Sequence, residues 1–223
     1  MKKVSSLLII LISLFALVGC RFTPKRVNIN IPIDEKEYTK EELTNGITHE
    51  EFKALNGDFI VVAKNTNSVV VDLTFEVEYY DENNSLIKSG KTYLTAVSPS
   101  SEVAVEIFDV PESYSSYKAY VDAEQSNYAK SYTDQLEVSD RMTDEVVAQV
   151  KNNSNETIDF METAVIFYKG DEVAGFDDAI ATEIKPGRYG NFSFYNPYDK
   201  NYADVEFDGY KVYVNSAYSY NYN

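Results

Sequence analysis

Hydrophobic and polar residues alternate over residues 69–80 of the chain. One face of this segment carries Val69, Val71, Leu73, Phe75, Val77 and Tyr79, and the other carries Asp72, Thr74, Glu76 and Glu78. A period of two residues predicts a β-strand, and the polar face indicates an antiparallel sheet with one buried side. Shorter segments with strand character follow between turn residues, at 58–64, 91–97, 102–108 and 116–122. The pattern therefore predicts an all-β fold.

The segment before these strands has a different pattern. Thr39 to Glu42 and Thr48 to Glu51 each have the spacing of a helix capping box, and Phe52 and Leu55 would form the apolar face of a short helix. We expect one or two helical turns here, with His49 as an exposed helix residue. The period changes to that of a strand beyond Asn56-Gly57.

The second half of the chain repeats the first at an offset near 90 residues. The matching segments, in order, are 62–67 and 149–154, 79–80 and 167–168, 97–100 and 184–187, and 117–122 and 210–215. Ordered correspondences of this kind indicate duplicated domains, and the period fits one seven-stranded sandwich per copy. We place domain 1 at 57–138 and domain 2 at 142–223. A polar stretch, Ser139 to Thr143, follows Ser131 to Val138, which reads as the last strand of domain 1.

The N-terminus has the pattern of an export signal. Lys2 and Lys3 precede an apolar run over residues 4–18, which is too short to span a bilayer. The run ends in Leu17-Val18-Gly19-Cys20, which resembles the lipobox of bacterial lipoproteins. The resemblance implies cleavage between Gly19 and Cys20 and attachment of a diacylglycerol to Cys20. The alternative is an ordinary secretory signal followed by a coincidental cysteine, but Cys20 is the only cysteine and has no disulfide partner.

These features divide the N-terminal part into a signal peptide, residues 1–19, and a segment over residues 20–56 that holds the lipidated cysteine, a spacer and the short helix. Within the spacer, Val27, Ile29, Ile31 and Ile33 alternate with polar or proline residues and could form an edge strand.

The repeated strands resemble a known domain family. Val77-Glu78-Tyr79-Tyr80-Asp81 in copy one and Val165-Ile166-Phe167-Tyr168-Lys169 in copy two are similar to the motif of FxLYD-type immunoglobulin-like domains of bacterial surface proteins. Copy one keeps Tyr-Asp but replaces the Phe and Leu of the motif, and copy two loses the Asp. The resemblance covers roughly residues 58–122 and 145–215. It implies two tandem immunoglobulin-like β-sandwiches.

Composition argues against most catalytic chemistry. The chain has one histidine, and lipidation would occupy its one cysteine, so neither a catalytic triad nor a multi-histidine metal site is available. No glycine-rich phosphate loop appears. We therefore predict no enzyme activity and no cofactor. The formal charge is −16, and removal of Lys2 and Lys3 makes it −18, which argues against nucleic acid as a partner.

Two weaker candidate sites remain. Asp81, Asp177 and Asp178 are weak calcium candidates, because neither of their segments has the spacing of a dedicated calcium loop and turn chemistry explains both segments better. Tyr218, Tyr220 and Tyr222 would form a stripe along a strand. That stripe would either stack on a glycan or peptide or simply pack against the sandwich.

The sequence predicts a lipid-anchored protein on the extracytoplasmic face of the cell membrane, in a Gram-positive bacterium by its composition. Its expected role is a binding or spacer module that contacts a cell-envelope polymer or another exported protein. The alternative is a substrate-capture lipoprotein that serves a transporter or envelope enzyme, which would need a concave pocket at the junction of the two domains.

Overall fold

The computed structural model describes residues 37–221, which lie in one compact unit. The predicted signal peptide, Gly19, Cys20, the alternating segment at 27–33 and Tyr222 lie outside the described residues.

The first sandwich consists of two three-stranded antiparallel sheets, with the strand orders β1-β2-β5 and β4-β3-β6. Its strands are β1 (Ile47–Lys53), β2 (Phe59–Asn65), β3 (Val71–Tyr80), β4 (Leu86–Val97), β5 (Glu102–Ile107) and β6 (Ser116–Gln125). A short helix, α1 (Lys40–Asn45), precedes them and packs on β6. Thr39 and Glu42 form the predicted capping box, in which each side chain accepts a hydrogen bond from the backbone of the other residue.

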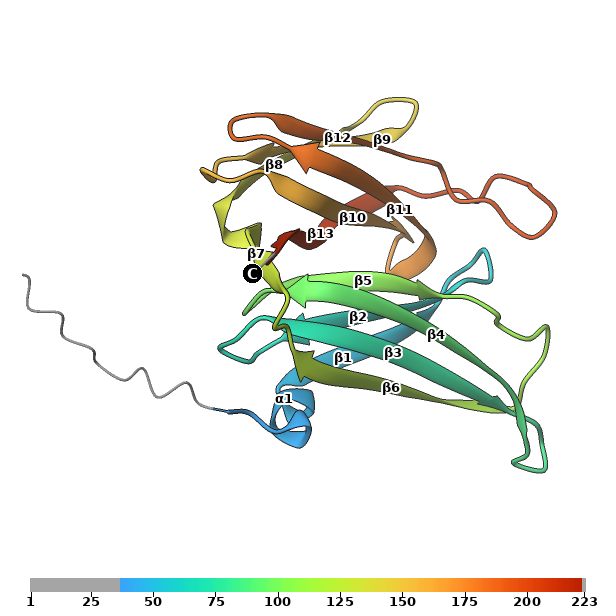
Figure 1. Cartoon of the computed structure of the whole chain (residues 1–223). Helices are drawn as coiled ribbons and strands as arrows, with labels where there is room; N and C mark the ends of the chain where they lie inside the picture. The colour runs from blue at the N-terminus through green and yellow to red at the C-terminus, as the bar shows by residue number, and fades with distance from the viewer. Residues whose placement is uncertain (1–36, 222–223) are drawn as a thin grey trace, which may run out of the picture. The chain divides into compact units, whose positions relative to one another are not determined.

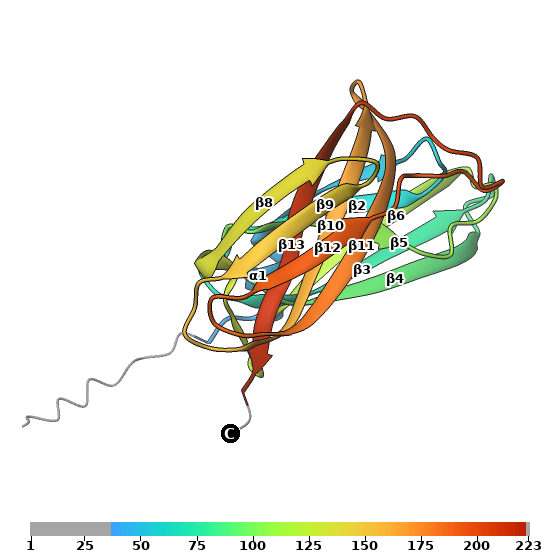
Figure 2. The ribbon, with the colours of Figure 1, turned by 90° about the horizontal axis from the view of Figure 1, so that it is seen from above.

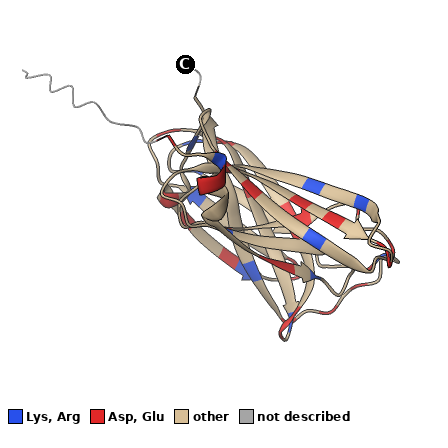
Figure 3. Cartoon of the chain, turned by 90° about the horizontal axis from the view of Figure 1, so that it is seen from below, with Lys and Arg blue, Asp and Glu red and all other residues tan. Residues whose placement is uncertain are grey.

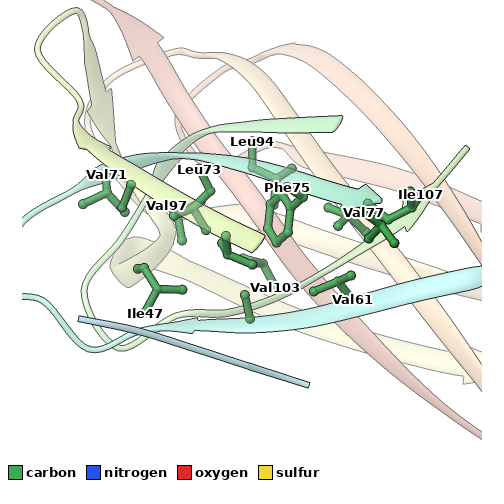
Figure 4. Packing of buried hydrophobic residues seen from close by; sticks show 14 of the residues in the cluster. Ile47, Val61, Val71, Leu73, Phe75, Val77, Leu94, Val97, Val103 and Ile107 are labelled. Atoms are coloured by element: carbon green, nitrogen blue, oxygen red, sulfur yellow. The ribbon is translucent and has the colours of Figure 1, made fainter. Parts of the chain in front are cut away.

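The core of this sandwich forms where apolar side chains of the two sheets meet. β3 alternates buried and half-buried residues along its whole length, as its sequence predicts. Its buried side chains, which include Leu73 and Phe75, point toward Val61 and Val103 of the opposite sheet (Figure 4). Burial of each large apolar side chain contributes about 1.5–3 kcal/mol, so the alternation decides which face of β3 is inside.

The second sandwich has a three-stranded sheet, β12-β9-β8, and a four-stranded sheet, β11-β10-β13-β7. Its strands are β7 (Ala129–Ser131), β8 (Leu136–Met142), β9 (Val146–Asn152), β10 (Ile158–Lys169), β11 (Glu172–Ile184), β12 (Tyr189–Phe194) and β13 (Gly209–Tyr220). A 3-10 turn, η1 (Thr133–Gln135), lies between β7 and β8. All strand pairs in both sandwiches are antiparallel, so the prediction of an antiparallel all-β sandwich fold is confirmed.

Strand order repeats between the sandwiches. Strands β1 to β6 correspond in turn to β8 to β13, and the pairings within each set are the same. The register agrees as well, because Tyr79 faces Tyr117 in the first sandwich and Phe167 faces Tyr210 in the second. The second sandwich differs in having β7 as an additional edge strand beside β13.

The two sandwiches stack face to face through an apolar cluster. It joins the outer side of β1-β2-β5 to the outer side of β11-β10-β13, and its members include Ile60, Ala104, Ala164, Ile166 and Tyr213. The four sheets therefore form successive layers, with β4-β3-β6 and β12-β9-β8 on the outside (Figure 1). Figure 2 shows β8, β9 and β12 as the layer nearest the viewer.

The residues on the outermost faces differ from those at the stacked faces. Ala164 and Ile166 of β10 correspond to Glu76 and Glu78 of β3, because Val165 and Val77 are matched by the repeat. Seen from below, acidic and basic residues are interspersed along the strands (Figure 3). Lys91, for example, pairs with Glu76 at 2.9 Å. The matched faces therefore differ: that of β3 is polar and partly exposed, and that of β10 is apolar and covered by the other sandwich.

The helix predicted within residues 48–55 is wrong. Residues 47–53 form β1, which pairs with β2 from Ile47 opposite Asn65 to Lys53 opposite Phe59. His49 is exposed on this strand, where its Nε2 lies 3.2 Å from Glu51 Oε1. Seven residues of cross-strand pairing outweigh the local helical signal, since helix propensity is a weak preference that tertiary contacts override.

The predicted domain limits, 57–138 and 142–223, do not match the strand pairing. β1 belongs to the first sandwich, which therefore begins before residue 57. The segment 131–138, predicted as the last strand of domain 1, contributes to β7 and β8, and these pair with β13 and β9 of the second sandwich. The chain thus crosses between sandwiches after β6, near residues 126–128. The sandwiches have six and seven strands instead of seven each.

Candidate functional site

A groove lies where loops of the two sandwiches meet, and we call it the junction groove. It is lined by residues 53–58 at the β1–β2 loop, 110–112 of the β5–β6 loop and 198–200 of the β12–β13 loop, and its volume is about 570 Å³. Volumes of 300–1,000 Å³ are typical of small-molecule sites, so the groove is large enough to hold a ligand or a peptide side chain.

The β12–β13 loop forms a small ordered hairpin. The carboxylate of Asp199 accepts backbone hydrogen bonds from Asn201 at 2.8 Å and Ala203 at 3.0 Å, and these bonds lower the pKa of Asp199. Tyr198 and Asp204 form a β-bridge. A loop held by its own hydrogen bonds presents its side chains in one arrangement, which reduces the entropic cost of binding.

One aromatic side chain of this hairpin, Tyr198, lines the groove, and it stacks on a second tyrosine of the same loop. The rings of Tyr198 and Tyr202 stack at 5.8 Å between centroids, and their exposed fractions are 53% and 84%. Tyr195, on the same loop, is 70% exposed. Exposed stacked rings offer an apolar face with a hydroxyl, a combination that suits sugars, peptides and cations.

A smaller hollow of about 150 Å³ adjoins the groove and shares Asn56, Asp58 and Tyr198 with it. We call it the acidic pocket, because Asp58, Glu106 and Asp177 line it. Burial raises the pKa of Glu106 to about 8, and the negative charges of Asp58 and then Asp178 add to the effect. Burial also raises the pKa of Asp58, while hydrogen bonds with Asn56 and Glu106 oppose the shift.

Backbone contacts between the sandwiches hold this region in place. The β1–β2 loop donates two hydrogen bonds to β11, from Leu55 N to Val173 O at 2.9 Å and from Asn56 N to Ala174 O at 3.3 Å. Gly175 permits this close approach, because a Cβ there would lie 3.0 Å from Nδ2 of Asn56 in the first sandwich, as well as 2.5 Å from the Cβ of Pro197 within the second. The groove is therefore formed jointly by both sandwiches.

The two described tyrosines of the predicted stripe, Tyr218 and Tyr220, differ in exposure. Tyr218 is buried in a cluster with Ala96 and Ala129, and its hydroxyl lies 3.3 Å from that of Tyr220. Tyr220 is 43% exposed. Tyr218 packs at the contact between the sandwiches, as the structural alternative for this stripe predicts.

The three weak calcium candidates do not come together. The carboxylate of Asp81 accepts the backbone N–H groups of Asn83 and Ser85, each at 2.8 Å, so it caps its own turn. The carboxylate of Asp177 accepts the backbone N–H of Tyr195 at 2.6 Å. Asp178 is the next residue of β11, in the second sandwich. Within residues 37–221, no group of three or more His, Cys, Asp and Glu side chains is arranged to hold a metal ion.

The groove and the acidic pocket were not predicted from the sequence. Their residues come from three loops and from β1, β5 and β11, and the most distant two, Lys53 and Lys200, are 147 positions apart, so no motif links them. One signal was present. Residues 161–167 do not alternate between apolar and polar side chains as β3 does, and this pattern indicates a strand that is covered on both faces. That observation would have predicted the stacking of the sandwiches and hence their junction.

No family model matches this chain, and no curated protein matches it significantly. None of the helices in the described part of the chain has the length and apolar character needed to cross a membrane.

Proposed function

We propose that this chain is a membrane-anchored extracytoplasmic lipoprotein that binds a cell-envelope polymer or another exported protein through the junction groove. The anchor in this proposal is a diacylglycerol on Cys20, as the resemblance of Leu17-Val18-Gly19-Cys20 to a lipobox implies. Two acyl chains are sufficient for stable membrane anchoring. The resemblance of the sequence motifs at 77–81 and 165–169 to that of FxLYD-type domains of bacterial surface proteins supports the same setting.

The observation that carries the proposal is the position of the groove. The described chain begins three residues before α1, and the C-terminal end of β13 lies at the same end of the molecule as α1 (Figure 1). β1 runs from that end to the groove and has seven residues, so the groove lies about 20 Å from the start of β1. A chain tethered through its N-terminus would hold the groove at the end away from the tether.

The lining of the site favours ligands that are neutral or positively charged. The carboxyl groups of the acidic pocket would repel an anion, and the net charge of the chain is −16. Lys53 and Lys200 lie in the groove beside Asp58 and Glu112, so the groove itself has mixed charge. A sugar or peptide would find stacking faces and hydrogen-bonding groups of both kinds here.

A second candidate function, capture of a small substrate for a transporter or envelope enzyme, is favoured by the same groove. This role requires a concave pocket at the junction, and a pocket of about 570 Å³ is present there. The two functions differ in the size of the ligand.

Two experiments test the proposal. The first follows the full chain and its Cys20→Ala variant in a Gram-positive host: the wild type is expected to incorporate labelled fatty acid and sediment with membranes, and the variant to do neither. Equal behaviour of the two would rule out the anchor. The second incubates the chain from Arg21 onward with isolated cell-wall material. Retention supports envelope binding, whereas a thermal shift with a small molecule and no retention supports substrate capture.

A further inference from the structure

Carboxyl groups from both sandwiches lie at the junction, and three of them, Asp58, Glu106 and Asp177, line the acidic pocket together. Asp58 and Glu106 belong to the first sandwich, on the β1–β2 loop and β5, while Glu162, Asp177 and Asp178 belong to β10 and β11 of the second. No ion pair between described residues involves any of these five groups. Their negative charges therefore lack a compensating cation in the part of the chain that the structure describes.

Glu106 occupies the centre of this arrangement. Its carboxyl is half-buried and lies in the acidic pocket with Asp58 of its own sandwich and Asp177 of the other, so ionised carboxylates would be held together there. Asp178, across the junction, acts on Glu106 through its charge, and Asp177 does so more weakly.

We infer that the contact between the two sandwiches is a pH-sensitive switch, which is closed while the Glu106 carboxyl holds a proton and loosens when that carboxyl ionises. Ionisation would give Glu106 a negative charge, which is repelled by the charge of Asp58 on its own sandwich and by that of Asp178 on the other. Like charges held close together in a partly buried site repel strongly, because solvent screens them poorly. The inference does not depend on the ligand of the groove.

The direction of the effect follows from the proton balance. Burial and the neighbouring carboxylates raise the pKa of Glu106 to about 8 in the closed junction, from an ordinary value of 4.5. Between pH 4.5 and about pH 8, the closed state therefore binds more protons than an open state does. Its stability is greatest below pH 4.5 and is lost as the pH rises through about 8.

The other groups at the junction limit how far it opens. Burial also raises the pKa values of Glu162, Asp177 and Asp178, so these groups act in the same direction. Opposing them, Lys211 on β13 pairs with Glu102 on β5 at 3.0 Å. Lys53 and Lys200 lie in the adjoining groove, and the apolar cluster persists at every pH. The expected change is a loosening of the junction without unfolding of either sandwich.

A backbone amide at the junction reports on this change. The Ala104 N–H points away from its own sheet and donates to Asn215 Oδ1 at 2.9 Å, so it is protected only while the sandwiches are docked. Phe75, in the central strand β3, pairs on both sides within the first sandwich and serves as the internal reference. The ratio of their hydrogen-exchange protection, corrected for intrinsic exchange, measures junction opening.

The experiment follows this ratio from pH 5.5 to 8.5 in the chain from Arg21 onward, which contains the whole compact unit. Protection of Ala104 relative to Phe75 is expected to fall at least about tenfold in the wild type and less than about threefold in Glu106→Gln. Glu137→Gln, which removes an exposed charge on β8, should retain the wild-type dependence. Asp58→Asn should move the midpoint of the fall to lower pH, because it removes a charge that raises the pKa of Glu106.

Two results would overturn the inference. One is a wild-type ratio that does not change with pH, and the other is an equal fall in the wild type and in Glu106→Gln. If Glu106→Gln does not fold, an unchanged midpoint in Asp58→Asn leads to the same conclusion.

Discussion

Asn65 and Asn152, 87 residues apart, make the same hydrogen bonds in the two sandwiches. The Nδ2 group of Asn65 donates to the carbonyl oxygens of Val69 and Val97, each at 3.0 Å. That of Asn152 donates to Glu156 and Ile184, each at 2.8 Å. Each pair of matched residues is separated by 87 positions: Asn65 and Asn152, Val69 and Glu156, and Val97 and Ile184. Each asparagine thus ties the end of the second strand of its copy to the end of the fourth.

The first prediction concerns this asparagine. Asn152 is fully buried, and its Oδ1 also accepts the N–H of Ser154 at 2.9 Å. Asn152→Ala leaves these backbone groups without partners, so it should lower the free energy of unfolding by at least about 2 kcal/mol. Urea denaturation measures the loss. Asn153→Ala, at the exposed neighbouring position, is the matched control and should change the stability by less than about 0.5 kcal/mol. Equal losses in both variants would contradict a structural role for Asn152.

A second prediction tests the close approach at Gly175. A methyl group there would lie 2.5 Å from Pro197 and 3.0 Å from the side chain of Asn56, so Gly175→Ala should destabilise the chain by about 1–3 kcal/mol. Thermal unfolding is the measurement. In the control, Gly209→Ala, the new methyl group meets its nearest neighbour, Tyr168, at 3.9 Å. Equal melting temperatures of the two glycine variants would contradict a close approach at Gly175.

A third prediction concerns the difference between the stacked and the outer faces. Ala164 is fully buried at the junction, and the matched residue of the first sandwich is Glu76. Ala164→Glu places a carboxylate in the apolar cluster and should cost at least about 3 kcal/mol, a loss that calorimetry can measure. The reverse change, Glu76→Ala, removes only an exposed ion pair with Lys91 and should cost less than about 1 kcal/mol. A small effect of Ala164→Glu would mean that the sandwiches are not stacked in this way.

Sequence patterns were sufficient to predict individual strands and the repeat. The alternation over residues 69–80 predicted β3, whose buried face is the one expected. The short motif around Asn65 and its counterpart at Asn152 indicated the repeat, because each turn requires the same residue. Local patterns report on the packing of a single strand, and these strands follow them.

The arrangement of strands between sandwiches could not be predicted in the same way. β7 has three residues and no pattern of its own, and only its pairing with β13 assigns it to the second sandwich. The groove residues Leu55, Pro111 and Tyr198 lie on separate loops that come together only when the sandwiches stack. Neither feature leaves a local signal, so both required the three-dimensional structure.

The junction groove is the proposed binding surface of this protein. The most direct test measures binding of the chain from Arg21 onward to isolated cell-wall material, in parallel for the wild type and for the double variant Tyr198→Ala, Tyr202→Ala. Both tyrosines are exposed, so their removal should not affect folding. Tyr189→Ala, on β12 and 51% exposed, is the matched control.

We expect the double variant to bind at least about tenfold more weakly than the wild type, because exposed aromatic residues contribute strongly to binding, and the control to bind as the wild type does. Equal binding by the double variant and the wild type would contradict the groove as the binding surface.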